Sequence, residues 1–156
     1  MDTEELTARP GTARSAVVLI TGAVVALWIV FGRFLFGLGG ELTIVYLLIG
    51  FLIVVLTVFI SRAMARTAAR GFSLRPSVWG TLGASWGCGL LLGLTIPDLT
   101  SEGLQTILSG TEQPWLDFAI GVANPSGIIM TALTIAALVL ANQDAHGPRP
   151  HEDDLL

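Results

Sequence analysis

LTIVYLLIGFLIVVLTVFI, residues 42–60, is a run of 19 residues without a single charge. The hydrocarbon core of a bilayer is about 30 Å thick, and a helix needs about 20 apolar residues to cross it. The run is rich in Ile, Val and Leu, and in lipid a lone segment satisfies its backbone hydrogen bonds only as a helix. We therefore interpret residues 42–60 as a transmembrane helix.

Three further windows have the length and composition of spans. They are AVVLITGAVVALWIVFGRFLF at 16–36, VWGTLGASWGCGLLLGLTI at 78–96 and LDFAIGVANPSGIIMTALTIAALVLA at 116–141. The first is longer than the apolar core of about 7–15 residues in a secretory signal, and no A-x-A-like site follows it, so we expect it to be retained. Together the four windows predict an all-α membrane protein with four transmembrane helices.

The composition of the chain agrees with a membrane protein. Of its 156 residues 53% are hydrophobic and 13% are charged, whereas a soluble domain carries about 25% charge. The net charge of −4 offers no basic surface for nucleic acid. All eight basic residues are Arg, which we attribute to GC-rich coding and hence to a bacterial source. The single cysteine, Cys88, excludes an internal disulfide, and no metal-binding cysteine spacing is present.

The distribution of arginines predicts how the chain is threaded. The connection 61–77 holds four Arg and no acid, and the two tails add three more. Because arginines near span ends favour the cytoplasmic side, both termini are expected in the cytoplasm. The domain organisation is then a cytoplasmic tail at 1–14, a membrane domain at 15–141 and a disordered cytoplasmic tail at 142–156, in the cell (cytoplasmic) membrane. The seven residues are Arg9, Arg14, Arg62, Arg66, Arg70, Arg75 and Arg149.

Both long connections are predicted to contain helix. In the acidic outer loop, 97–117, the apolar residues Leu104, Ile107 and Leu108 recur at helical spacing, which favours a short amphipathic helix on the outer surface. In the inner connection, alanines fill the spaces between the arginines, and nothing interrupts a helix before Gly71. We therefore expect the second helix to continue to about Arg70.

Glycines of the third span form a candidate helix-packing face. Gly83 and Gly87, and then Gly89 and Gly93, are two small-x-x-x-small pairs. Such pairs let another backbone approach closely. The partner is either another helix of the same four-helix unit, or a second copy or a different protein.

Asn124 and Arg33 are the candidate polar residues within the membrane. Asn124 precedes Pro125 in the fourth span. Either this span is one helix kinked at Pro125, with the Gly121 carbonyl freed, or a helix begins at Pro125 and directs its N-terminus at an anion. Arg33 lies near the outer end of the first span. It either snorkels to the headgroups or pairs with Glu41, or else it binds a substrate or lipid phosphate.

The residue types within the spans exclude several kinds of chemistry. No span contains His or Lys, and no span interior contains a carboxylate. Haem therefore lacks an axial histidine, serine lacks a base, and proton coupling lacks its usual acid. We expect no catalytic residue, no cofactor and no metal site, and hence no enzyme. The histidines, His146 and His151, belong to the predicted solvated tail.

Three functional hypotheses follow. The leading one is a structural or accessory subunit that packs in the lipid bilayer against a larger membrane-protein complex or against itself. The alternative is a small oligomeric transporter or channel. An enzyme subunit acting on lipid headgroups through Arg33 and the acidic outer loop ranks last. The path of the transporter would be lined by Thr81, Ser85, Asn124, Pro125, Thr131 and Thr134.

Overall fold

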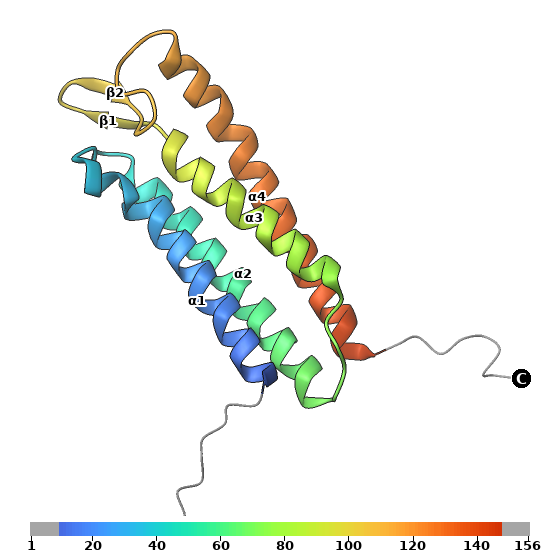
Figure 1. The fold of residues 1–156 in the computed structure, drawn as a ribbon. Helices are drawn as coiled ribbons and strands as arrows, with labels where there is room; N and C mark the ends of the chain where they lie inside the picture. Colours follow the sequence, from blue (N-terminus) through green and yellow to red (C-terminus); the bar gives the residue numbers. More distant parts are fainter. Residues whose placement is uncertain (1–9, 148–156) are drawn as a thin grey trace, which may run out of the picture.

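A computed structural model describes residues 10–147 and is mostly helical, as predicted (Figure 1). A short 3-10 helix, η1, follows the first long helix, and a small antiparallel hairpin follows the third. The four long helices are α1 Pro10–Phe31, α2 Thr43–Ala69, α3 Pro76–Thr95 and α4 Trp115–His146, and the shorter elements are η1 Gly32–Phe36, β1 Asp98–Thr100 and β2 Gly103–Gln105.

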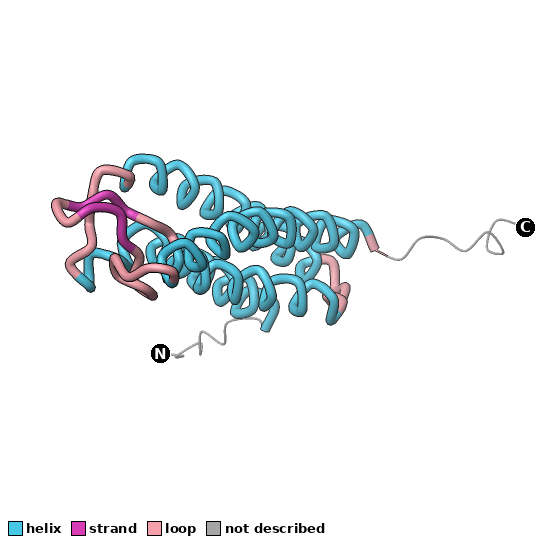
Figure 2. The backbone as a smooth tube through the Cα atoms, turned by 90° about the horizontal axis from the view of Figure 1, so that it is seen from above, coloured by secondary structure: helices cyan, strands magenta, loops and turns pink. Residues whose placement is uncertain are grey.

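The helices form two antiparallel pairs that lie side by side. α1 packs on α2 and α3 packs on α4, while α2 also contacts α4 and α1 contacts α3. The start of α1, the α2–α3 connection and the end of α4 lie together at one end, which we call the termini end (Figure 1). The hairpin and η1 lie at the opposite end, the hairpin end (Figure 2).

Within residues 10–147, three helical segments are long and apolar enough to cross a membrane: Gly11–Phe36, Thr43–Ala69 and Trp115–His146. Many large apolar side chains are exposed on the outside of the bundle, among them Leu35 at 80% and Ile44 at 73%. Inside, small and branched residues fill the core, with Ala119, Ala137 and Ile60 completely buried. α3 is not among these segments, because its glycines lower its mean hydropathy.

The predicted extension of the second helix is confirmed. α2 continues through the arginines to Ala69, and Gly71 follows with a φ of +76°. A residue in this left-handed conformation commonly ends a helix, and glycine adopts it without steric cost.

The predicted amphipathic helix in the outer loop is wrong. Leu104 lies in β2, and residues 106–110 form a turn closed by a bridge between Thr106 and Gly110. Gly103 and Gly110 both have positive φ, which interrupts a helix on either side. The segment between them is too short to offset the cost of nucleating a helix.

The fourth span is one helix from Trp115 to His146, with Pro125 inside it. The alternative of a separate helix beginning at Pro125 is therefore wrong. α4 also continues five residues beyond the predicted end of the span at Ala141, and α1 already begins at Pro10, inside the predicted N-terminal tail. Residues 1–9 and 148–156, including His151, lie outside the described part of the chain.

Candidate functional site

The most buried charges of the described chain meet at the hairpin end. Arg33, from η1, is 2% exposed, and Asp98, the first residue of β1, is 1% exposed. Arg33 Nη1 lies 3.0 Å from Asp98 Oδ2, although this nitrogen has no aligned hydrogen-bond acceptor among the described residues. The expected snorkelling of Arg33, or its pairing with Glu41, is therefore wrong.

Asp98 also organises the beginning of α2. Its Oδ2 accepts the backbone N–H of Gly40 at 3.0 Å, and its Oδ1 accepts the N–H of Leu42 at 3.1 Å. Leu42 is the N-cap of α2, so the carboxylate lies where free helical N–H groups and the helix dipole favour a negative charge. A Cβ at position 40 would collide with the Leu99 carbonyl and with Asp98, which explains the glycine there.

Tyr46 completes this arrangement from the first turns of α2. The guanidinium carbon of Arg33 lies 4.0 Å from the centre of its ring, a cation–π distance. The Tyr46 hydroxyl donates to the Pro97 carbonyl at 2.6 Å. We call Arg33, Tyr46 and Asp98, with these backbone partners, the buried charge network.

This network links the segment between α1 and α2 to the segment that follows α3. It also leaves Arg33 inaccessible to a lipid phosphate. Arg33 was predictable as a polar residue of the membrane region, whereas Asp98 and Tyr46 were not predicted from the sequence. Asp98 follows directly after the third span and Pro97. This position at the end of a span was the feature of the sequence that could have identified it as a partner for Arg33. Its contact with Arg33, 65 positions earlier (98 − 33), depends on the α1–α3 packing, which no local pattern reports.

The second candidate region is a groove of about 640 Å³ between α2 and α4, with α3 as its floor. Tyr46 and Pro97 border it toward the hairpin end, and Asn124 lies in its α4 wall. Asn124 is exposed, and its amide makes no hydrogen bond with any of the described residues. The lining residues are Tyr46, Ile49, Leu52, Leu92, Ile96, Pro97, Ile120, Ala123, Asn124, Gly127, Ile128, Thr131, Ala132 and Ile135.

The hydroxyl groups expected along a transport path have partners within the chain. Ser85 Oγ and Thr134 Oγ1 lie 2.7 Å apart in the core, where one hydroxyl donates to the other and the second donates to the Met130 carbonyl, which is within hydrogen-bond distance of both. Thr131 donates to the Gly127 carbonyl and Thr81 to that of Ser77. The structure thus brings Ser85 and Thr134 together, but it does not bring them to Asn124, which faces outward.

The four glycines of the candidate packing face divide into two groups. Side chains at Gly89 and Gly93 would overlap Val25 and Trp28 of α1, so these glycines pack inside the bundle. The Trp28 indole also donates to the Leu90 carbonyl at 3.1 Å. Gly83 and Gly87 face open space, with nothing of the described chain within 4 Å of an added Cβ.

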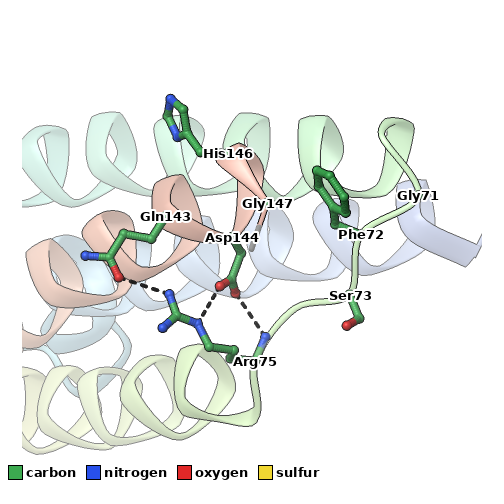
Figure 3. Close-up of a pocket in the computed structure, with 8 residues that line it drawn as sticks. All are labelled: Gly71, Phe72, Ser73, Arg75, Gln143, Asp144, His146 and Gly147. Carbon is green, nitrogen blue, oxygen red and sulfur yellow. Dashed lines mark hydrogen bonds and ion pairs between the residues drawn. The ribbon is translucent and has the colours of Figure 1, made fainter. Parts of the chain in front are cut away.

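At the termini end, arginines hold the last turns of α4. Arg75 Nε pairs with Asp144 Oδ1, the Arg75 backbone N–H donates to Asp144 Oδ2 at 2.9 Å, and Arg75 Nη2 donates to Gln143 at 3.0 Å (Figure 3). Arg70 donates to the Ala145 carbonyl at 2.6 Å, one of the carbonyls that a helix end leaves free. These bonds explain why α4 extends to His146.

An open pocket of about 1050 Å³ adjoins this ion pair (Figure 3). Phe72 and His146 line it, but the His146 ring nitrogen contacts the Asn142 carbonyl at 2.7 Å rather than a partner within the pocket. Among residues 10–147, no group of three His, Cys, Asp or Glu side chains is placed to hold a metal ion. Cys88 is a half-buried free thiol.

Comparisons of the chain with models of known protein families, with curated proteins and with solved structures find no match.

Proposed function

We propose that this chain is a four-span membrane protein of the cell membrane, with both termini in the cytoplasm. In this proposal it serves as a structural or accessory subunit of a larger membrane complex or of a homo-oligomer. Three apolar helices support membrane insertion. α3 has 20 residues, or about 30 Å at 1.5 Å per residue, which equals the thickness of the hydrocarbon core.

The charges at the two ends support this threading. The α2–α3 region at the termini end carries Arg62, Arg66, Arg70 and Arg75, whereas the hairpin end carries acidic residues. The rule that arginines stay on the cytoplasmic side then places the termini end in the cytoplasm.

The observation that carries the accessory role is the open face of α3. Gly80, Gly83 and Gly87 lie on one side of the helix with Ala84, all exposed, and no described residue covers the three glycines. In a lipid environment helix association relies on close backbone packing, for which small residues are selected. We call these four residues the open α3 face and propose that it contacts another transmembrane helix.

The internal bonding of the polar groups favours this role over transport. Ser85, Thr131 and Thr134 have hydrogen-bond partners inside the bundle, so a polar path would have to break existing bonds. The buried charge network likewise leaves Arg33 no free face for a headgroup, which weighs against an enzyme acting on lipids.

The test is purification of the full-length chain from its native membrane in a mild detergent, followed by identification of everything that remains bound. We expect a bound membrane protein, either a different protein or a copy held at the open α3 face, that is lost in the double variant Gly83→Leu/Gly87→Leu. Val24→Phe is the control, because it enlarges a 57% exposed side chain on α1 away from the open α3 face. Wild-type chain that elutes alone, or a double variant that keeps its partner, contradicts the proposal.

A further inference from the structure

Asn124 is the exception on an otherwise apolar ridge of α4. The exposed positions of this ridge between Phe118 and Val139 include Gly121, Pro125, Ile128, Ile129, Ala132 and Ile135. Among these described residues only Asn124 has a polar side chain, and none of its hydrogen-bonding atoms has a partner in residues 10–147. In lipid such an amide is costly, because nothing in the hydrocarbon replaces the water that it loses.

A backbone acceptor lies one turn away on the same ridge. Pro125 has no N–H, so the carbonyl of Gly121 cannot accept the usual helical bond from the residue four positions later. Gly121 is exposed, and nothing of the described chain lies within 4 Å of an added Cβ. A donor on a neighbouring molecule can therefore approach this carbonyl without a side chain in the way.

The depth of Asn124 limits which molecule can satisfy it. In the proposed threading Asp117, in the first turn of α4, lies at the outer membrane surface. Asn124 is seven residues further along, or about 10 Å along the helix axis at 1.5 Å per residue. The ester and headgroup atoms of phospholipids lie at the membrane surface, and acyl chains at this depth have no hydrogen-bonding group. A polypeptide with a polar group at the same depth does meet the need.

We propose that the α4 ridge around Asn124, with the adjoining α2–α4 groove, is the contact surface for a second copy of this chain. An asparagine amide both donates and accepts, so two Asn124 side chains pair with each other across a twofold axis, where one surface meets its own copy. The second copy brings its polar group to the same depth by symmetry. Each amide also has the partner's Gly121 carbonyl as a nearby acceptor.

The groove supplies the apolar part of this contact. Its walls are Ile49 and Leu52 of α2 and Ile128 and Ile135 of α4. Exposed small residues of the ridge, Gly121 and Ala132, alternate with its larger apolar side chains, so the ridge can interlock with such a groove on its partner. This inference rests on the membrane insertion in the proposed function, but it uses a different helix from the open α3 face.

The experiment measures crosslinking of the full-length chain in lipid vesicles. In a Cys88→Ala background, Ile128→Cys places a thiol one turn from Asn124 on the same ridge, and Val24→Cys places one on α1. We expect oxidation to link two copies through position 128 and not through position 24. Adding Asn124→Leu should weaken the dimer roughly 3- to 30-fold, the range for a polar contact between transmembrane helices.

Two control variants keep the result interpretable. Thr81→Val removes a hydroxyl that already has a partner in its own helix, at a position on α3 outside the groove and the ridge, so it should leave crosslinking unchanged. Gly83→Leu/Gly87→Leu should also leave it unchanged, because the open α3 face is not involved. The helix content of Asn124→Leu should equal that of wild type, since Asn124 bonds nothing in its own chain.

The inference is overturned if Ile128→Cys does not link two copies, if Asn124→Leu crosslinks as well as the parent, or if a bound lipid, rather than a second copy, is lost in Asn124→Leu. Loss of crosslinking only in the Gly83→Leu/Gly87→Leu variant would overturn it while supporting the open α3 face. Crosslinking that depends on Asn124, without any partner lost at the open α3 face, would support it while contradicting the accessory role of α3.

Discussion

Removing the carboxylate of Asp98 is expected to destabilise the bundle more than any other single change at the hairpin end. Asp98→Ala deletes the ion-pair partner of Arg33 at 3.0 Å and the acceptor of the Gly40 and Leu42 N–H groups. Arg33 would then be an unpaired charge that is 2% exposed.

The size of the effect follows from these contacts. Breaking a buried ion pair from one side costs about 3–5 kcal/mol, because the remaining charge stays buried. The cation–π contact of Arg33 with Tyr46 keeps part of the charge stabilised. We therefore expect Asp98→Ala to lower the free energy of unfolding by about 4 kcal/mol.

Arg33→Met is expected to cost only about half as much, about 2 kcal/mol. Asp98 would still accept the N–H groups of Gly40 and Leu42 at the start of α2, where a negative charge is favoured, and the N–H of Leu99 in β1. Asp98→Ala combined with Arg33→Met should lower the free energy of unfolding by about 1–2 kcal/mol less than the sum of the two separate losses, since both changes remove one shared interaction.

The assay is reversible unfolding of the full-length chain in mixed micelles by SDS titration, followed by far-UV circular dichroism. Glu41→Gln is the matched control: Glu41 is the acid nearest to Arg33 in sequence, but it is exposed and makes no ion pair within the described residues. It should change the free energy of unfolding by less than about 0.5 kcal/mol. A larger loss in the free energy of unfolding for Arg33→Met than for Asp98→Ala would contradict the second role of Asp98 at the start of α2. Strictly additive losses in the double variant would show that Arg33 and Asp98 do not interact.

Three further predictions use the same unfolding measurement. Gly93→Ala should lose about 1–3 kcal/mol because its Cβ overlaps Trp28, whereas Gly83→Ala should be neutral or gain up to about 1 kcal/mol in helix propensity; equal losses would contradict the division of the glycine face. Ser85→Ala should cost about 1 kcal/mol, and Ser85→Ala with Thr134→Val should cost less than the two separate losses; fully additive losses would mean that the hydroxyls do not interact. Asp144→Ala should cost about 1 kcal/mol, because the half-exposed Arg75 side chain regains water when its partner is removed, and should speed hydrogen exchange in the last turn of α4, while Gln143→Ala should do much less; unchanged exchange would show that Arg75 does not hold this end.

The sequence alone determined the helical class and the approximate positions of the helices. Runs such as residues 42–60 are decided locally, because an apolar segment of this length has few alternatives to a helix in lipid. The extension of α2 to Ala69 and the end of the helix near Gly71 were also local, since they depend on helix propensity and on one residue with positive φ. The spacing of Leu104, Ile107 and Leu108 misled, because three residues cannot outweigh the two glycines with positive φ around them.

Only the tertiary structure decided which polar groups meet. Arg33 pairs with Asp98 rather than the nearby Glu41 because the packing of α1 beside α3 brings η1 to the start of β1. The same packing covers Gly89 and Gly93 but leaves Gly83 and Gly87 open, although the two pairs have the same spacing in the sequence. The physical reason is that helix periodicity defines the faces of a helix, whereas the neighbour of each face depends on contacts between residues far apart in the chain.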